Sequence, residues 1–395
     1  MPWRLNGGDD VRRGAMVNRR PMRIAVLGGG PAGLYFASLW KARHPDSEVR
    51  LFEQNPGDVT WGFGVVFSER ALEFLRDDDP TTYGLITPKM EAWRDITLVH
   101  RGERIRIDGV GFSAIGRLEL LQILQSRARA VGVELEFGRV IRSLDELGGF
   151  DLVVAADGLN SLVRRTFEGD FGTSVNQLDN KFAWYGTRQR FDSLTLTFVT
   201  TPEGTFTAHH YRYSQEMSTF IVECDRATWE RVGFDTMKPE AATAYCERAF
   251  VDTLGGNPLV SNNTYWRTFP QVANRRWSFR NLVLVGDALH TAHFSIGSGT
   301  RLAMEDVIAL AKGLEAEPGD VRAGLARYEA LRKPILDKLV TAANASAAWH
   351  ETFPKHMALA PREFALSYIT RSGRIDPARL REMSPAFMKY VEGGS

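Results

Sequence analysis

A glycine-rich turn near the start of the chain has the spacing needed to bind a phosphate group. Gly28, Gly30 and Gly33 are spaced as G-x-G-x-x-G, with Pro31 and Ala32 between the last two glycines. In such a turn Gly28 permits a tight bend, Gly30 lets a pyrophosphate approach the backbone, and Gly33 lets a helix pack closely on a strand. These residues therefore predict the turn of a dinucleotide-binding motif.

The segments around this turn have the order that the motif requires. Residues 22–27 are an apolar run rich in β-branched residues, which predicts a buried parallel strand. Residues 34–43 predict a helix, and residues 47–52 predict a second strand. That strand ends at Glu53, twenty residues beyond Gly33, where a carboxylate accepts hydrogen bonds from an adenosine ribose. We therefore predict dinucleotide binding, although this motif alone does not distinguish NAD from FAD.

Two further apolar strands end in turns that pair an aspartate with a glycine. The first turn follows residues 150–156 and is Asp157-Gly158, and the second follows residues 281–285 and carries Asp287. A single turn of this kind is common, because glycine and aspartate both favour turns. The order G-x-G-x-x-G, then Asp-Gly, then Gly-Asp is much less common, and it narrows the choice of cofactor.

This order resembles that of the group A flavoprotein aromatic hydroxylases, which share the fold of p-hydroxybenzoate hydroxylase. The resemblance covers roughly residues 22–335 and implies an α/β protein that binds FAD tightly. It implies that Asp287 binds the ribityl chain of FAD and that Asp157 lies where FAD and the nicotinamide cofactor both pass. It also implies that Arg117, at the start of a predicted helix, touches the FAD.

A second glycine pair resembles the loop that faces the flavin ring in the same family. Gly297, Gly299 and Thr300 stand at the start of a predicted helix. The N–H groups and the positive end of such a helix can stabilise a reduced, anionic flavin. Phe294 stands where most members of the family have proline, and Arg301 where most have asparagine. These departures leave the cofactor assignment intact and make the substrate side of the loop unusual.

His290 and His293 follow Asp287 with the spacing D-x-x-H-x-x-H, which could suggest a metal site. A metal ion would need a further cluster of ligands, and the rest of the chain has only scattered histidines. We therefore expect no metal. His293 is the candidate catalytic residue, because a histidine with a pKa near neutrality can deprotonate a phenol. A structural role, with His293 hydrogen-bonded into the loop, fits the sequence equally well.

Residues 61–68, 213–229 and 286–306 resemble salicyloyl-CoA 5-hydroxylases and the monooxygenase half of 2-aminobenzoyl-CoA monooxygenase/reductases. The resemblance implies an enzyme that uses NADH or NADPH as a transient co-substrate and O₂, through a flavin C4a-hydroperoxide, to hydroxylate an electron-rich aromatic ring. The favoured substrate is an aryl-CoA thioester such as salicyloyl-CoA. We expect no C-terminal flavin-reductase half, which favours plain hydroxylation over hydroxylation with ring reduction.

Other functions remain open at this point. A free aromatic compound or an indole derived from tryptophan could replace the thioester as substrate. A flavoprotein reductase acting on isoprenoid double bonds, or a flavin-binding protein without catalytic activity, would share the FAD motifs. A flavin-dependent halogenase is disfavoured, because the W-x-W-x-I-P signature of that class is absent.

The motifs predict two domains, a Rossmann-type FAD-binding domain and a substrate domain inserted into it. The segment between the Asp-Gly and Gly-Asp motifs is rich in aromatic and β-branched residues with partial alternation, which predicts an antiparallel sheet. We also expect some strands of the substrate domain near residues 60–110. The predicted divisions are residues 1–21 as a disordered leader, 22–180 and 270–335 as the FAD-binding domain, 181–269 as the substrate domain, and 336–395 as a C-terminal helical region.

The composition is that of a globular protein and excludes several classes. The 395 residues are 44% apolar and 25% charged. A net charge of +1 provides no basic excess for binding nucleic acid. Two cysteines are too few for a disulfide framework, and no apolar run is long enough to cross a bilayer. We therefore expect a cytoplasmic monomer or homodimer that binds a small aromatic molecule, and neither nucleic acid nor membrane.

Overall fold

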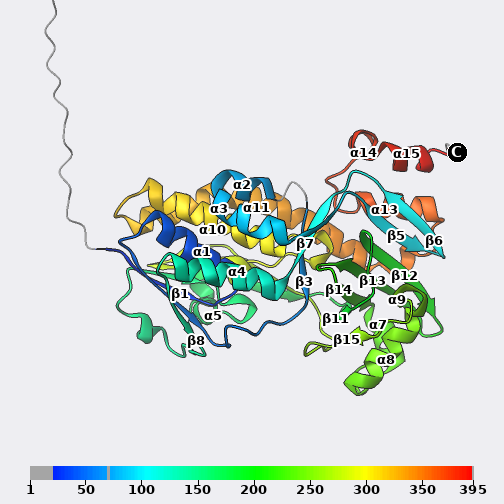
Figure 1. Cartoon of the computed structure of the whole chain (residues 1–395), viewed down its shortest axis with the longest axis horizontal. Helices are drawn as coiled ribbons and strands as arrows, with labels where there is room; N and C mark the ends of the chain where they lie inside the picture. Colours follow the sequence, from blue (N-terminus) through cyan, green and yellow to red (C-terminus); the bar gives the residue numbers. More distant parts are fainter. Residues whose placement is uncertain (1–20, 69–71, 394–395) are drawn as a thin grey trace, which may run out of the picture.

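The computed structural model describes residues 21–68 and 72–393, which form a mixed α/β protein (Figure 1). Apart from Pro21, the predicted leader at residues 1–21 lies outside the described residues. A six-stranded sheet occupies one end of the molecule and a seven-stranded sheet the other. The helix α11 (Val321–Glu351) joins the two ends, because its first half packs in the core of the first sheet and Trp349, near its end, packs against the second.

The six-stranded sheet is parallel except at one edge. In order across the sheet, its strands are β17 (Ser278–Phe279), β18 (Leu282–Leu284), β9 (Leu152–Ala155), β1 (Arg23–Leu27), β2 (Glu48–Glu53) and β8 (Glu134–Phe137). Only β17 and β18 pair antiparallel. The strands β1, β9 and β18 are buried almost throughout, as expected for continuous apolar runs in a sheet covered on both faces. Chain order reverses at β1, and ligands bind beyond the carboxyl ends of strands at such a point.

Helices cover this sheet. Figure 1 shows α1 (Pro31–Arg43), α4 (Arg117–Ala130), α10 (Gly299–Ala316) and α11 stacked on one side of it. The helix α1 begins at Pro31, whose fixed φ suits the first helical position, and ends with Lys41 and Arg43, whose charges favour the negative end of the helix. The remaining short helices of this half are α2 (Glu73–Asp78), α3 (Pro80–Ile86), α5 (Leu162–Thr166) and α6 (Glu168–Phe171).

The seven-stranded sheet is antiparallel except where β12 pairs with β5. In order, its strands are β15 (Leu259–Val260), β11 (Lys181–Thr187), β14 (Ser218–Cys224), β13 (Gly204–Arg212), β12 (Leu194–Thr201), β5 (Ile96–His100) and β6 (Glu103–Ile107). A three-stranded sheet of β3 (Gly64–Ser68), β7 (Phe112–Gly116) and β4 (Glu91–Trp93) lies between the two larger sheets (Figure 1). A two-stranded sheet pairs β10 (Thr173–Gln177) with β16 (Pro270–Asn274).

Two groups of helices bury the seven-stranded sheet. The first group packs on β11, β13 and β14 and comprises α7 (Arg226–Val232), α8 (Pro239–Ala249) and α9 (Val251–Leu254). The C-terminal group packs on β5, β6 and β12 and comprises α12 (Phe353–His356), α13 (Pro361–Thr370), α14 (Pro377–Met383) and α15 (Pro385–Val391). The C-terminal segment is thus part of the core of this half.

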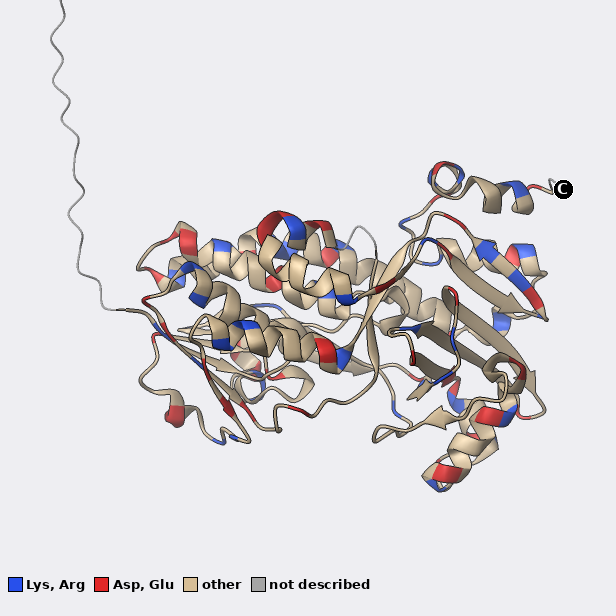
Figure 2. Cartoon of the chain, viewed as in Figure 1, with Lys and Arg blue, Asp and Glu red and all other residues tan. Residues whose placement is uncertain are grey.

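Charged residues of both signs are interspersed along the ribbon in both halves of the molecule (Figure 2). This mixture agrees with the net charge of +1 over the full chain. Among the described residues, no helix combines the length and the apolar character needed to span a membrane.

Candidate functional site

The predicted cofactor residues lie at one edge of the parallel sheet. Gly28 follows β1, Glu53 ends β2, Asp157 follows β9, and Asp287 follows β18. Because these strands are parallel, their carboxyl ends meet at the same edge. The structure therefore brings together four positions that the sequence spreads over more than 250 residues.

The glycine turn is built as the motif requires. Gly28 has a φ of +100°, which favours glycine, and a Cβ there would overlap the backbone carbonyl of Ala156. A Cβ on Gly33 would overlap the carbonyl oxygen of Gly28. At Gly30, by contrast, a Cβ would meet nothing within 4 Å. Gly28 and Gly33 are therefore required by the packing of the protein itself. Gly30 instead faces open space at the N-terminus of α1, where backbone N–H groups favour an anion.

The carboxylate of Glu53 lies against this turn. Its Oε2 accepts a hydrogen bond from the Gly29 N–H at 2.6 Å. Its Oε1 accepts from the backbone N–H and the side-chain amide of Asn55, at 2.8 and 2.7 Å. The carboxylate is therefore fixed at the edge of the glycine turn, on the strand where the sequence predicts a ribose contact.

The Asp-Gly turn provides a buried acceptor. Oδ2 of Asp157 accepts a hydrogen bond from the Leu162 N–H at 2.7 Å, whereas Oδ1 is buried without a partner among the described residues. Burial raises the pKa of this carboxyl, against the effect of hydrogen bonds from Ser161 and Leu162. A buried oxygen without a partner is costly, so this position fits a ligand that donates a hydrogen bond.

Asp287 and Arg117 face the same region from different elements. The Asp287 side chain is exposed, yet protein surrounds it closely enough that desolvation raises the pKa of its carboxyl, while Arg117 lowers it. The guanidinium of Arg117 donates to Thr60 Oγ1 at 3.1 Å, and burial lowers its pKa. Together they place an exposed carboxyl and a partly buried guanidinium close enough to interact.

Arg164 ties the two aspartate turns together, a role that the sequence interpretation missed. Its guanidinium donates to the carbonyl oxygens of Ala288 at 2.9 Å and Asp287 at 3.3 Å, and also to that of Leu159. The only sequence signal for this role was that Arg164 lies seven residues after Asp157. An arginine on the surface could have the same spacing, so the spacing does not predict the role.

The loop before α10 has an open helix start. Gly297 has a φ of +57°, and a Cβ there would lie 2.9 Å from Val66 Cγ1. Ser298 precedes α10 without a side-chain hydrogen bond to the helix, and a Cβ on Gly299 would meet nothing within 4 Å. The first N–H groups of α10, including that of Thr300, therefore have no side-chain cap and suit an electron-rich ring edge. Arg301 pairs with Glu305 at 2.7 Å.

His290 anchors the Gly-Asp turn to the helices behind it. Its Nε2 lies 2.7 Å from Oδ2 of the fully buried Asp306 on α10. Arg332 on α11 donates to Oδ1 of the same carboxylate at 2.8 Å. Burial alone would raise the pKa of Asp306, but His290 and Arg332 outweigh burial and lower it. This histidine is thus held by a carboxylate and belongs to the support of the loop.

His293 is buried within the loop that leads to α10. Its Nδ1 lies 2.8 Å from Ser295 Oγ, and its ring packs edge-on against Phe269 at 4.9 Å between centroids. Burial lowers the pKa of His293 to about 3, although Glu223 acts in the opposite direction. At neutral pH the imidazole is therefore uncharged. The catalytic role of His293 stays a prediction.

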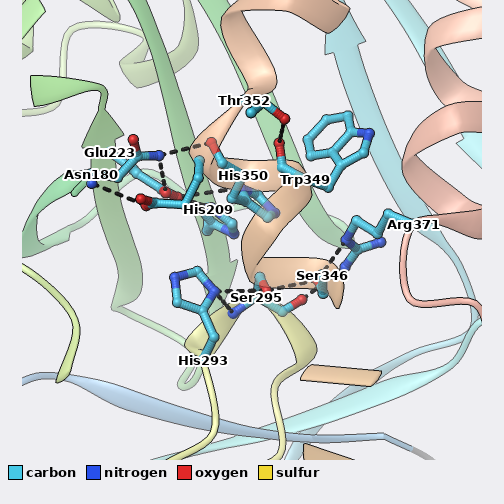
Figure 3. Close-up of polar contacts among 11 residues, drawn as sticks. Asn180, His209, Glu223, His293, Ser295, Ser346, Trp349, His350, Thr352 and Arg371 are labelled. Atoms are coloured by element: carbon cyan, nitrogen blue, oxygen red, sulfur yellow. Dashed lines mark hydrogen bonds and ion pairs between the residues drawn. The ribbon is translucent and has the colours of Figure 1, made fainter. Parts of the chain in front are cut away.

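A cluster around Glu223 was not found from the sequence (Figure 3). Glu223 on β14 accepts a hydrogen bond from the Asn180 side-chain amide at 2.9 Å through Oε1. Its Oε2 lies 3.2 Å from His209 Nε2 and 3.3 Å from His350 Nδ1. Burial opposes ionisation of this carboxyl, but His350 and His209 outweigh it and hold its pKa well below the usual value. We call these four residues the Glu223 cluster.

The Glu223 cluster also has the ligands of a possible metal site. One ligand atom each from His209, Glu223 and His350 lies within 4.8 Å of the others, and two histidines with a carboxylate form a known metal-binding set. Hydrogen bonding already supplies the carboxylate with partners. The expectation that the protein holds no metal stays a prediction.

The buried histidines predict a pH dependence of stability. Burial lowers the pKa of His293 to about 3 and that of His350 to about 4, from an ordinary value of 6.5. The unfolded chain therefore binds more protons than the native protein below about pH 6.5, and the free energy of unfolding should fall as the pH drops from 7 to 5. Urea unfolding at several pH values measures this slope.

The variant His350→Gln should flatten that slope, since glutamine does not titrate. His44→Gln is the matched control, because the His44 side chain is 37% exposed. The lowered pKa values of Glu223 and Asp306 act at lower pH, where their stabilising effect is lost as the carboxylates become protonated. A free energy of unfolding that stays constant between pH 7 and 5 would contradict the assignment of neutral, buried imidazoles.

Comparisons with known proteins agree with this geometry. Residues 150–343 match the model of the FAD binding domain family. The salicyloyl-CoA 5-hydroxylase of a Streptomyces species is 41% identical over 382 residues, which cover 94% of this chain and 74% of that protein. The 3-hydroxy-4-methyl-anthranilyl-[aryl-carrier protein] 5-monooxygenase of Streptosporangium sibiricum is 38% identical and covers 90% of this chain and 95% of its own.

A solved structure shows the same fold. The tetrameric form of 2-methyl-3-hydroxypyridine-5-carboxylic acid oxygenase superposes with a TM-score of 0.67 over 92% of this chain and 96% of that protein, at 17% identity. At this identity the likeness concerns the fold alone. The fold, the family match and the two relatives together confirm the resemblance that the three motifs predicted.

Proposed function

The chain belongs to the FAD binding domain family of FAD-dependent aromatic monooxygenases, and we propose that its substrate is a benzoyl thioester with an electron donor at ring carbon 2. The reaction then inserts one oxygen atom at carbon 5. Within this class, salicyloyl-CoA is the substrate that we consider first.

The names of the two relatives support this substrate class. One acts on salicyloyl-CoA and the other on an anthranilyl group attached to an aryl-carrier protein, and both act at position 5. A salicyl ring has a hydroxyl and an anthranilyl ring an amine at carbon 2, and carbon 5 is para to both. An electron donor at carbon 2 makes carbon 5 reactive toward an electrophilic oxygen. The proposal rests on two features that the names of both relatives share, the thioester-linked substrate and oxygen insertion at position 5.

We propose that the carboxyl edge of the parallel sheet binds FAD. When bound, FAD that NADH or NADPH has reduced supplies the activated oxygen. The N-terminus of α1 binds the pyrophosphate, Glu53 the adenosine ribose, Asp287 the ribityl hydroxyls, and the N-terminus of α10 the flavin ring. The full set proposed to contact the cofactor is Gly28, Gly30, Pro31, Ala32, Gly33, Glu53, Arg117, Asp157, Gly158, Asp287, Gly297, Gly299 and Thr300.

We propose that the substrate ring lies against the aromatic side chains where the loop before α10 contacts the seven-stranded sheet. Phe294 of this loop packs 4.9 Å from Phe182 on β11 and 5.2 Å from His209 on β13, between ring centroids. Phe269 adds a third phenylalanine, 6.1 Å from Phe294. Such a wall suits an aromatic ring and excludes water, which protects a reactive oxidant from side reactions.

A substrate panel tests this function. The protein loaded with FAD is mixed in air with NADH or NADPH and with salicyloyl-CoA, 2-aminobenzoyl-CoA, or the free acids. We expect the thioesters to stimulate oxidation of the reduced nicotinamide and to yield a product with one more oxygen, at carbon 5. Stimulation by the free acids alone would contradict the thioester assignment. No stimulation by any aromatic compound, with FAD still bound, would contradict the proposed function.

A further inference from the structure

The C-terminal segment contacts the loop that holds His293. Arg371 directly follows α13, and its Nη2 donates to the carbonyl oxygen of Ser295 at 2.8 Å. Its Nε donates to Oγ of Ser346 on α11 at 2.9 Å, and its guanidinium lies over the Tyr368 ring at 3.7 Å. No carboxylate among the described residues pairs with Arg371. Its Nη1 donates to the carbonyl oxygen of Tyr368 at 2.7 Å, so its polar contacts link α13 to this loop and to α11.

These contacts form one end of a chain of hydrogen bonds that runs from Arg371 to His293 (Figure 3). A guanidinium only donates, so Ser346 Oγ must accept from Arg371. Ser346 Oγ also lies 2.8 Å from Ser295 Oγ, and either hydroxyl can donate across this contact, because a hydroxyl oxygen accepts up to two hydrogen bonds. Ser295 Oγ in turn lies 2.8 Å from His293 Nδ1, so the protonation of Nδ1 sets the direction of the chain.

A backbone donor settles the role of this nitrogen. The backbone N–H of Ser295 points at His293 Nδ1, at 3.4 Å. A backbone N–H only donates, so Nδ1 must accept, and a neutral imidazole carries its proton on Nε2. The Ser295 hydroxyl then donates its single proton to Nδ1, and the Ser346 hydroxyl must donate to Ser295. Nε2 lies on the far edge of the ring from Ser295 in Figure 3, and no described residue forms a hydrogen bond with it.

We propose that Arg371 and Ser346 are positioning residues that hold His293 in the Nε2–H form, and that His293 donates a hydrogen bond to the ring oxygen at carbon 2 of the substrate. This inference rests on the proposed function for the identity of that oxygen. It assigns His293 a role as a donor, in place of the base predicted from the sequence. The hydroxyl proton of the substrate leaves to solvent on binding, and His293 keeps its own.

The groups around His293 also favour the neutral imidazole with its proton on Nε2. A protonated ring would need Nδ1 to donate, and the backbone N–H of Ser295 would then face another donor. Burial also opposes a charge on His293, while Glu223 attracts one and His350, His209 and Arg371 repel it, and the balance lowers the pKa of His293. A donor facing an ionised oxygen stabilises the phenolate, and a phenolate is more reactive toward an electrophilic oxygen than a phenol.

The protonation of His293 can be observed without substrate. The FAD-loaded protein is labelled with ¹⁵N in its eight histidines, and the His293 signals are assigned by their loss in His293→Gln. We expect a protonated Nε2 and an unprotonated Nδ1 at pH 7. A protonated Nδ1, alone or together with a protonated Nε2, would overturn the proposal.

Two substitutions of Arg371 distinguish an effect on the direction of the hydrogen bonds from an effect on side-chain packing. Arg371→Lys keeps a group that only donates, whereas Arg371→Gln introduces an amide oxygen that can accept from Ser346 and reverse the chain. Ser346→Ala removes the link, and Ser367→Ala on α13, which bonds Trp349 instead, is the matched control. The readout is the pKa of salicyloyl-CoA bound to the oxidised, FAD-loaded protein, followed by its phenolate absorbance.

We expect the bound phenolate pKa to rise by about one unit, a tenfold change in ionisation, in Ser346→Ala and Arg371→Gln. Arg371→Lys and Ser367→Ala should stay close to the original protein. Equal shifts in the lysine and glutamine variants, or no shift in Ser346→Ala, would overturn the proposed direction. If salicyloyl-CoA does not bind, the proposed substrate fails and with it the donor role, whereas the ¹⁵N measurement still decides the form of His293.

Discussion

Replacing Gly30 with alanine is expected to give a folded protein that binds FAD much more weakly. The backbone at Gly30 has a φ of −74°, which alanine adopts without strain, and its Cβ would meet no protein atom within 4 Å. The new methyl group would instead occupy the space through which a pyrophosphate approaches the N-terminus of α1. We expect FAD affinity to fall about tenfold or more, equivalent to at least ~1.4 kcal/mol.

Gly33→Ala is the matched comparison, because its Cβ points into the protein. It would overlap the carbonyl oxygen of Gly28, which is backbone and cannot rotate away. The cost should lie at or above the upper end of the range of about 1–3 kcal/mol for overpacking. Thermal unfolding of the FAD-free proteins and titration with FAD separate the two effects. Wild-type affinity in a folded Gly30→Ala protein would contradict the assignment of this turn to the pyrophosphate.

Replacing Asp306 with alanine is expected to destabilise the protein by about 3–5 kcal/mol, the range for breaking a buried ion pair. Asp306 is fully buried and is the common acceptor of His290 and Arg332. Without it, the His290 imidazole loses its carboxylate partner, and Arg332 keeps Glu305 at 2.8 Å and the carbonyl oxygen of Leu302 at 3.4 Å. Because His290 lies three residues beyond Asp287, we also expect weaker FAD retention.

Urea unfolding measures this cost. Glu392→Ala is the control, since its ion pair with Arg381 is about half exposed and should contribute between about 0 and 1 kcal/mol. The native pKa of Asp306 is lowered, so its contribution is present above the pKa of the unfolded state and is lost as the pH falls through the native value. The difference between the original protein and Asp306→Ala should therefore shrink in acid. Equal costs for Asp306→Ala and Glu392→Ala would contradict the role of this carboxylate.

The sequence predicted the family and the cofactor because the residues concerned lie in short contiguous segments. The glycine turn, Glu53, Asp157 and Asp287 each stand directly at the end of an apolar strand, and parallel strands bring their carboxyl ends to one edge. The order of the motifs and the apolar runs therefore carry the information, and the relatives confirm the resulting family and FAD dependence. The role of each residue toward FAD stays a prediction.

The Glu223 cluster and Arg371 could not be predicted in the same way. Asn180 precedes β11, His209 and Glu223 lie on β13 and β14, and His350 lies near the end of α11. In sequence these are isolated polar residues within apolar strands and a long amphipathic helix, and each has the pattern of an ordinary surface or core position. The tail was expected to pack as helices, without any link to His293.

The glycine spacing, the strand–turn–helix order and the order of the three motifs by themselves predicted that this chain binds a dinucleotide and resembles flavin hydroxylases, because phosphate binding depends on local backbone geometry. Only the tertiary structure decided which side chains surround His293 and in which direction their hydrogen bonds run. These hydrogen bonds extend to Arg371, 78 residues beyond His293 in the chain, and contacts between distant segments leave no periodic trace in a single sequence.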